Sequence, residues 1–345
     1  KYNRNAAKIK KSGGGSSGSG SDASKTATVI DEKSDTLYIG GGTPSLLTAL
    51  QINKIINAAK PVLTDDAEIT IEVNPGDDLA ELLPKISIAG VNRLSIGMQS
   101  HCDKELKLLT RRHNSADVDN VISLAKECGI NNISLDVMIG IEGQTLNSLK
   151  DTLDFCAKSD VTHVSAYMLK IEPNTLFGKQ NPTLPGDELQ AEQYLYMCER
   201  LQKAGYNHYE ISNFALPGYE AKHNSAYWRH VPYIGLGPGA HSYVDGSRQW
   251  NVENLTAYLE AGQSGDFSKV REGEVLDKEQ LTIEKIMLAL RTSIGVREDF
   301  LRDSCSEPEL DHAFECGNLV RLDDGSVRIP ENKFFISDNI ISSII

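Results

Sequence analysis

Five apolar segments, each followed by a stretch with helical character, constrain the fold of this chain more than any other feature. They are TLYIG (36–40), EITIEV (68–73), RLSIGMQ (93–99), NISLDVMIG (132–140) and HVSAYMLKI (163–171). Their near-continuous apolar character is typical of parallel strands that are covered on both faces. Repeated strand–helix units predict an α/β domain with a parallel sheet, either a barrel or a doubly wound sheet.

Composition narrows the classes of ligand and partner. The 345 residues carry a formal net charge of −13, from 35 Lys and Arg against 48 Asp and Glu. This acidic surplus argues against a general affinity for nucleic-acid backbones or anionic membranes, because both favour Lys-rich and Arg-rich surfaces. No apolar run approaches the roughly 18 residues of a membrane-spanning helix, and the N-terminal part lacks a hydrophobic signal core. We expect a cytoplasmic protein that does not bind nucleic acid.

The six cysteines do not form a recognisable ligand set. No two of them are spaced as C-x-x-C, and most lie in segments with helical character; they are Cys102, Cys128, Cys156, Cys198, Cys305 and Cys316. Such thiols commonly behave as small buried hydrophobic groups. We therefore predict no metal site.

Polar residues and glycines stand at the ends of the five apolar segments. In a barrel, the C-terminal ends of the strands and the loops that follow them build the ligand site. Glu72, Gln99 and Asp136 stand near these ends, and Arg111 follows the third segment. Arg111 suits a carboxylate, Glu72 an ammonium group and Asp136 a ribose hydroxyl. They predict a site for a small zwitterion; the alternative is that these carboxylates only cap neighbouring helices.

Three consecutive glycines, Gly40 to Gly42, follow the first apolar segment. Glycine sacrifices backbone entropy, so its use here indicates either a tight turn or a ligand that approaches bare backbone N–H groups. Physical reasoning alone leaves both interpretations open.

Six motifs, in order along the chain, resemble those of radical S-adenosylmethionine proteins related to oxygen-independent coproporphyrinogen oxidase. They are YIGGGTPSLL, IEVNPGD, NRLSIGMQS, LLTRRH, ISLDVMIGIEGQT and HVSAYMLKIEPNT. The resemblance implies a partial barrel of six strand–helix units with S-adenosylmethionine across the strand ends. The positions that match the family's cofactor contacts are Gly41, Gly42, Thr43, Glu72, Gln99, Arg111, Asp136 and Ala166.

The sequence departs from this family at its beginning. Members that perform radical chemistry carry a first strand resembling Y-I-H-I-P-F-C-x-x-x-C-x-Y-C, whose three thiolates hold a four-iron four-sulfur cluster. No such stretch is present, so TLYIG corresponds to the second strand of the family's barrel. Either the chain is a truncated piece, or it is a relative that has lost the cluster. Residues 1–11 are then a remnant of the intervening helix, and the edge of TLYIG is expected to be unpaired.

Four parts are expected along the chain. Residues 1–33 are a flexible Gly/Ser-rich segment, residues 34–215 a partial radical S-adenosylmethionine barrel that lacks its first strand, and residues 216–280 a connecting region. Residues 281–345 form a small C-terminal α+β domain, in which Asp324-Gly325 is expected to be a two-residue hairpin turn.

The segment HNSAYW places His223, Tyr227 and Trp228 close together. An imidazole with flat aromatic neighbours suits a heme, although a packed core histidine is the alternative. With the later GLGPGAHS, the segment resembles the HemW-type heme chaperones. That resemblance implies a carrier that delivers heme to acceptor proteins, with S-adenosylmethionine and a cluster in support.

Some functional questions stay open at this point. The alternative function is an oxygen-independent coproporphyrinogen III dehydrogenase in porphyrin biosynthesis, so whether the protein is an enzyme is undecided, and no catalytic residue is assigned. A homodimer and a membrane-protein acceptor also stay open as partners.

Overall fold

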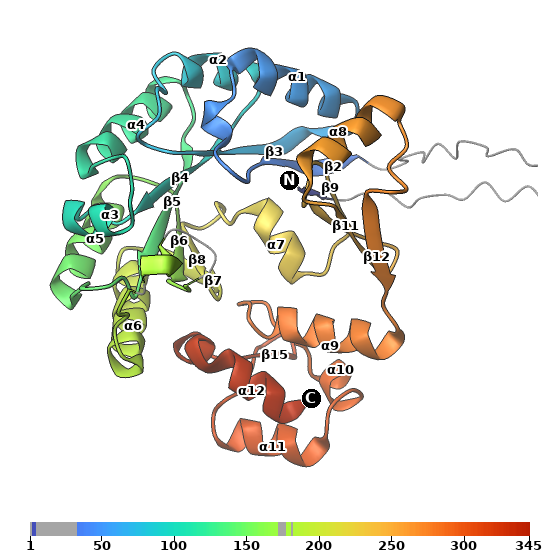
Figure 1. The fold of residues 1–345 in the computed structure, drawn as a ribbon. Coiled ribbons are helices and arrows are strands. Elements are labelled where there is room, and N and C mark those ends of the chain that lie inside the picture. Colours follow the sequence, from blue (N-terminus) through green and yellow to red (C-terminus); the bar gives the residue numbers. More distant parts are fainter. Residues whose placement is uncertain (1, 5–32, 172–176, 181) are drawn as a thin grey trace, which may run out of the picture.

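A single curled sheet organises the molecule. The structure is a computed structural model that describes residues 2–4, 33–171, 177–180 and 182–345. Within these residues, twelve strands form one sheet in the order β12-β11-β10-β9-β1-β2-β3-β4-β5-β6-β8-β7. Figure 1 shows helices α1 to α6 along the outside of the curve and α7 inside it.

Five neighbouring parallel strands form the centre of this sheet. They pair in the order of the sequence and are β2 (Ser34–Ile39), β3 (Leu63–Val73), β4 (Arg93–Gln99), β5 (Asn132–Ile139) and β6 (His163–Met168). This confirms the predicted strands and the partial-barrel fold. The parallel arrangement brings the C-terminal ends of all five strands to one edge, where Gly40 to Thr43 follow β2.

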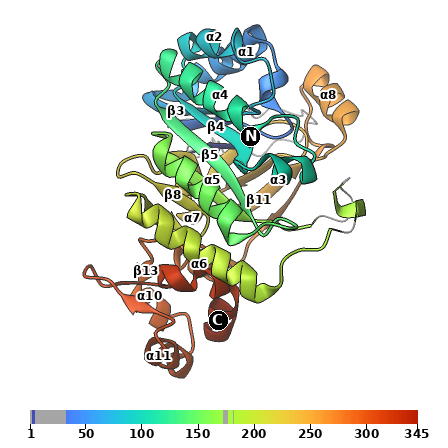
Figure 2. The same cartoon turned by 90° about the vertical axis from the view of Figure 1, so that its left-hand side faces the viewer.

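Helices cover the outer face of the parallel strands (Figure 2). They are α1 (Ala49–Ala59), α2 (Leu82–Ala89), α3 (Asp103–Leu108), α4 (Ser115–Glu127), α5 (Leu146–Lys158) and α6 (Asp187–Lys203), with 3-10 turns η1 (Pro44–Leu46), η2 (Lys60–Val62) and η3 (Gly178–Gln180). Strand residues such as Leu94 and Leu135 join helix residues such as Ile56 and Leu149 in one buried core. Burial of this apolar surface is the main force that holds the helices on the sheet.

The inner face of the sheet is polar, which corrects the expectation of strands that are apolar on both faces. Side chains alternate across a strand, so the residues between the core positions point inward. These inner residues are Thr36, Tyr38, Thr70, Glu72, Arg93, Ser95, Ser134, Asp136, His163 and Ser165. Hydrogen bonds join several of them, for example Ser134 Oγ to His163 Nδ1 at 2.7 Å. The inside of the curve is therefore a polar network and not a second hydrophobic layer.

Antiparallel strands extend the sheet at both edges. On one side lie β8 (Asn213–Ala215) and β7 (Asn207–Glu210); on the other lie β1 (Tyr2–Arg4), β9 (Tyr233–Gly235), β10 (His241–Val244), β11 (Ser247–Asn251) and β12 (Arg271–Val275). Strand β1 lies between β2 and β9, with Asn3 opposite Leu37. Two expectations are corrected here: residues 2–4 form a strand and not a helix, and the edge of β2 is paired. The rest of residues 1–11 lies outside the described part.

Helix α7 (Lys222–Trp228) lies on the inner side of the sheet. A carboxylate from a distant part of the sequence fixes its first turn. The backbone N–H groups of Lys222 and His223 donate to Glu68 Oε2 and Oε1, at 3.1 and 3.0 Å. A carboxylate is favourable at this end of a helix because it satisfies unpaired N–H groups and meets the positive end of the helix dipole. Glu68 therefore anchors α7 to β3.

The C-terminal residues form a small unit below the sheet in Figure 1, preceded by α8 (Leu255–Ser264). Its elements are α9 (Lys278–Ala289), β13 (Val296–Arg297), α10 (Glu298–Arg302), α11 (Glu307–Glu315), β14 (Val320–Arg321), β15 (Ser326–Arg328), η4 (Glu331–Ile336) and α12 (Ser337–Ile344). The predicted hairpin joins β14 and β15, but Leu322 N donates to Ser326 O at 2.8 Å and closes a three-residue loop. Gly325, at φ +80°, supplies the left-handed residue that such a loop requires.

Among the described residues, none of the helices has both the length and the apolar composition that crossing a membrane requires.

Candidate functional site

The three glycines form an open backbone ledge at the end of β2. The N–H of Gly41 donates to Glu72 Oε2 at 3.0 Å, and its φ of 95° is a conformation that favours glycine. A Cβ atom on Gly40 would lie 2.5 Å from Glu72 Oε1, whereas one on Gly42 would meet no atom within 4 Å. Gly40 is therefore required by packing, while Gly42 borders open space. A groove of about 700 Å³ runs beside this ledge, between α1 and Leu236.

The side chains of Gln99 and Arg111 lie beside Gly97, near the C-terminal end of β4. Arg111 Nη2 donates to Gly97 O at 2.9 Å, and a Cβ atom on Gly97 would lie 3.0 Å from Arg111 Nη2 and 3.3 Å from Gln99 Nε2. Gln99 has φ 68°, where the pairing of β4 and β5 is irregular. The buried Nε of Arg111 has no hydrogen-bond partner within the described residues. Desolvation lowers the pKa of this guanidinium, which remains a cation.

Asp136 lies on the inner face of β5, beside Ser95 of the neighbouring strand β4. Ser95 Oγ donates to its Oδ1 at 3.0 Å. Desolvation, with a further contribution from the nearby negative charge of Glu72, raises its pKa to about 7, although the Ser95 hydrogen bond and two arginines oppose the shift. The carboxyl group thus carries a proton for part of the time near neutral pH.

Two further candidate residues lie in different surroundings. Thr43 directly precedes η1, at the end of the glycine ledge. Ala166 belongs to the hydrophobic core, and its backbone N–H donates to Ser212 O at 2.7 Å. The side chain of Ala166 therefore points to the opposite face of the sheet from Glu72 and Asp136.

The resemblance implies S-adenosylmethionine and a four-iron four-sulfur cluster for the barrel, and the described residues fit the first but not the second. Open backbone at Gly42, an unpartnered buried Nε on Arg111, and the carboxyl groups of Glu72 and Asp136 suit a small zwitterion such as S-adenosylmethionine. They do not fit a four-iron four-sulfur cluster, since no group of three potential metal-binding side chains occurs among them. All six cysteines are free thiols, and Cys156 and Cys198 are buried.

Tyr38 is a site residue that the sequence analysis missed. Its hydroxyl donates to Glu72 Oε1 at 2.9 Å, and its ring stacks on His223 with 4.9 Å between ring centroids. Desolvation and the neighbouring carboxylates raise the pKa of the hydroxyl, which stays protonated. The alternation of Thr36 and Tyr38 with the core residues Leu37 and Ile39 was the signal that could have indicated its inward direction.

His223 lies at the start of α7 with 3% of its surface exposed. Its Nδ1 is 2.9 Å from Thr36 Oγ1, and its Nε2 is 2.9 Å from the hydroxyl of Tyr227. The structure thus brings His223 and Tyr227 together, with both imidazole nitrogens engaged in hydrogen bonds.

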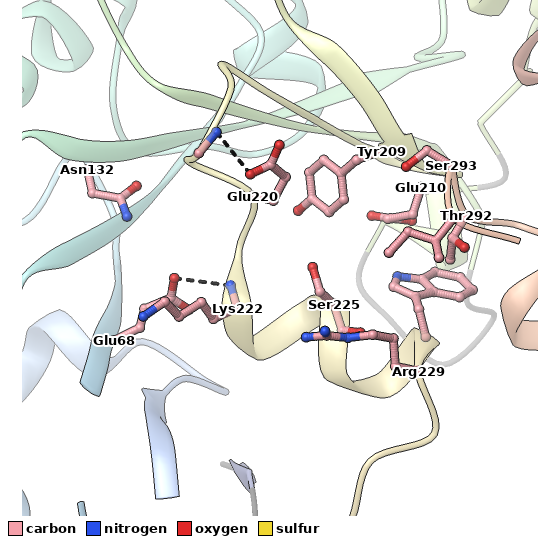
Figure 3. A pocket seen from close by; sticks show the side chains of 13 residues that line it. Glu68, Asn132, Tyr209, Glu210, Glu220, Lys222, Ser225, Arg229, Thr292 and Ser293 are labelled. Atoms are coloured by element: carbon pink, nitrogen blue, oxygen red, sulfur yellow. Dashed lines mark hydrogen bonds between the residues drawn. The ribbon is translucent and has the colours of Figure 1, made fainter. Parts of the chain in front are cut away.

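Trp228 lies on another face of α7 and borders a cavity of about 490 Å³ (Figure 3). Successive helical residues are rotated by about 100°, so residues 223 and 228 point roughly 140° apart. Lys222, Ser225 and Arg229 border the same cavity, and Tyr209 and Glu210 face it from the end of β7. The HNSAYW segment therefore divides between two environments, which the linear motif did not indicate.

Comparison with known proteins gives consistent similarities. A family model described as "Radical SAM superfamily" matches residues 21–156. The protein "Heme chaperone HemW" of Bacillus subtilis is 39% identical over 268 residues, which cover 76% of this chain and 70% of that protein. The protein of the same name from Lactococcus lactis is 36% identical over 271 residues, which cover 77% of this chain and 71% of that protein.

A solved structure supports the fold. The coproporphyrinogen III oxidase HemN of Escherichia coli, described as a radical SAM enzyme, matches with a TM-score of 0.74 over 90% of this chain and 77% of that chain. Its sequence identity is 20%, so the likeness concerns the fold alone.

The two outer positions of the glycine ledge make a matched test of packing. We expect Gly40→Ala to lower the free energy of unfolding by about 1–3 kcal/mol, because its Cβ overlaps Glu72 and Tyr38. Gly42→Ala is expected to change it by less than about 0.5 kcal/mol, because its Cβ enters open space. Urea unfolding followed by circular dichroism measures both; equal losses would contradict the assigned packing.

The raised pKa of Asp136 makes the stability of the fold depend on pH. Its pKa is raised from 3.8 to about 7 in the folded state, so the native protein binds this proton more tightly than the unfolded chain does. Stability is therefore lost as pH rises through this window. Asp136→Asn should flatten that loss and raise stability at pH 8 by about 2 kcal/mol, a value reduced for solvent at the opening.

Glu210 is a second group for this test, because burial also raises its pKa to about 7. The measurement is urea unfolding at a series of pH values for both Asp136→Asn and Glu210→Gln. A slope in Asp136→Asn identical to that of the unmodified chain would show that Asp136 does not titrate in this range.

Proposed function

The chain belongs to the HemW family, and on that premise we propose that it binds heme and delivers it to acceptor proteins. The observation that carries this proposal is the identity of 39% to a heme chaperone HemW over 70% of that protein's length. The alternative, a coproporphyrinogen III dehydrogenase, has only a likeness of fold to HemN at 20% identity behind it. The heme carrier is the better supported of the two.

We also propose that the opening at the strand ends binds S-adenosylmethionine. Its amino-acid end would lie along Gly41, Gly42 and Thr43, with Arg111 as a partner for the carboxylate and Glu72 for the ammonium group. Asp136 would accept from the ribose hydroxyls. The remaining contacts proposed from the family's motifs are Gln99 and Ala166, the latter through its backbone. When bound, this cofactor supplies a reactive sulfonium group, and the role of these residues is to orient it.

The family's four-iron four-sulfur cluster is not assigned to any residue of this chain. The described residues do not fit it, so we derive no step that passes through a cluster.

For heme, we propose α7 as the binding element, with His223, Tyr227 and Trp228 as its contacts. Trp228 already borders a cavity, so its indole can pack against a porphyrin ring without rearrangement. Coordination of iron by His223 would require its imidazole to leave Thr36 or Tyr227. The other role open to His223 is to hold α7 against β2 through Thr36.

The proposed division of labour follows the expected parts of the chain. Residues 34–215 hold the cofactor, residues 216–280 hold heme, and residues 281–345 contact partners. Heme-accepting proteins are the proposed partners, with a membrane-protein acceptor and a homodimer as the more specific possibilities.

A hemin titration followed by Soret absorbance tests the carrier proposal. We expect saturable binding by the unmodified chain and weaker binding by His223→Ala, which removes either an iron ligand or the group that fixes α7. A changed Soret maximum at saturation would indicate the ligand role, and an unchanged maximum the positioning role. His241→Ala, a change of an exposed histidine on β10, is the matched control.

Two outcomes would count against this proposal, for different reasons. Absence of saturable binding by the folded, unmodified chain would contradict heme binding itself. Unchanged affinity in His223→Ala would remove His223 from the site while the carrier function stands.

Binding of S-adenosylmethionine has a separate test at Gly42. A methyl group there would occupy the space against the backbone that the cofactor needs, so Gly42→Ala should weaken binding at least about tenfold. Isothermal titration calorimetry measures the affinity. Because Gly42→Ala is expected to leave stability unchanged, a loss of binding is attributable to the ledge; equal affinity would contradict the placement of the cofactor.

A further inference from the structure

We propose that the cavity on the Trp228 face of α7 holds the carboxylate-bearing edge of heme, with Lys222 and Arg229 as its anion-binding residues. This inference rests on the proposed heme binding and specifies where and how it occurs. The cavity lies between α7, the end of β7 and residues 292–294, which follow α9 (Figure 3).

Three carboxylates among the described residues border this cavity, and each accepts at least one hydrogen bond. Both oxygens of Glu68 accept from the first turn of α7, and Glu220 Oε2 accepts from Gly218 N at 3.1 Å. Glu210 accepts from Ser212 N at 3.0 Å and from the side chain of Asn213. These neutral donors do not cancel the carboxylate charges, but the charge of Glu68 faces the positive end of the α7 dipole. Burial raises the pKa of Glu210 to about 7, so this side chain is partly protonated near neutral pH. Among these three, Glu220 is then the one lining carboxylate with neither compensation, and it stands against two cations.

The positive charges are in the opposite situation. Lys222 and Arg229 are exposed, and the ammonium group of Lys222 forms no hydrogen bond or ion pair with a described residue, although its charge adds to the hydrogen bonds that lower the pKa of the nearby Asp66. Arg229 donates only from Nε, to Ser225 O at 3.3 Å, which leaves both terminal nitrogens of its guanidinium without a described partner. In a protein of net charge −13, two such cations at one cavity favour an anionic ligand.

Helix geometry places these cations on one side. Residues seven apart are two turns apart, so Lys222 and Arg229 extend from the same face of α7 at a separation of roughly 10 Å along its axis. Both side chains are long and flexible, and each can reach one of two neighbouring carboxylates. A dicarboxylate matches this pair better than a monoanion does.

The aromatic and apolar residues in the walls of the cavity favour a ligand that also has a flat apolar part. Trp228 and Tyr209 present rings to it, and Ile294 adds an aliphatic side chain that is 60% exposed. Its volume of about 490 Å³ lies in the range of small-molecule sites. A flat apolar ring with two carboxylates along one edge combines both features, and heme has this form. Heme in this position leaves His223 in its bonds to Thr36 and Tyr227.

The test compares hemin with hemin dimethyl ester, in which both propionates are neutral. Charge-assisted hydrogen bonds are among the stronger polar contacts, so the double variant Lys222→Gln/Arg229→Gln should raise the dissociation constant of hemin at least about tenfold. The same variant should bind the ester as the unmodified chain does. Trp228→Leu should weaken both ligands, because it removes an apolar wall. Lys85→Gln on α2 is the control for the loss of an exposed positive charge.

Each outcome decides one question. Saturable hemin binding that is equally tight in the double variant overturns this site but leaves the carrier function in place. An equal loss for hemin and its ester also overturns it, since the loss would then not involve the carboxylates. Absence of saturable hemin binding by the unmodified chain overturns the proposed function together with this inference. Thermal unfolding of every variant verifies that α7 remains folded.

Discussion

The polar inner face of the sheet is the constraint on which the rest of this structure depends. Helices α1 to α6 cover only the outer side of the parallel strands, so the inward side chains must be satisfied by one another and by what packs inside the curve, including α7. Glu68 meets this requirement for the start of α7, with hydrogen bonds of 3.1 and 3.0 Å to two N–H groups. Without that carboxylate, two N–H groups in the first turn of α7 would lose their hydrogen-bond partner on β3.

Much of the fold was predictable, for identifiable reasons. The five parallel strands follow from segments such as RLSIGMQ, because a continuous core face leaves a strong apolar signal. The polar inner face was not predicted, because the near-continuous apolar character of the segments indicated strands covered on both faces. Ser95 and Asp136 are alternate positions of this polar layer. The pairing of Tyr2–Arg4 with β2 and β9 was not predictable, because Asn3 pairs with Leu37 of β2 and with Ile234 of β9, and contacts so far apart in the sequence leave no local pattern.

The two candidate sites also differ in how far the sequence could predict them. Gly41, Glu72, Arg111 and Asp136 could be grouped from sequence because parallel strands bring their C-terminal ends to one edge. The residues of the cavity beside Trp228 could not be grouped, since Glu68 of β3 stands more than a hundred residues before Tyr209 and Lys222. The motif HNSAYW was informative about residue types and misleading about direction. Five residues of helix turn His223 and Trp228 away from each other, so one motif contributes to two environments.

Tyr38 connects the strand ends around Glu72 with the start of helix α7. Its hydroxyl donates to Glu72, which also accepts from the glycine ledge, and its ring stacks on His223 at the start of α7. A cationic group that approaches Glu72 from the opening must compete with Tyr38 for the same carboxylate. Any displacement of Tyr38 changes the surface on which His223 rests, and His223 in turn is bonded to Thr36 and Tyr227. The strand ends and helix α7 therefore share one side chain, so a ligand that displaced Tyr38 from Glu72 would also change the support of His223.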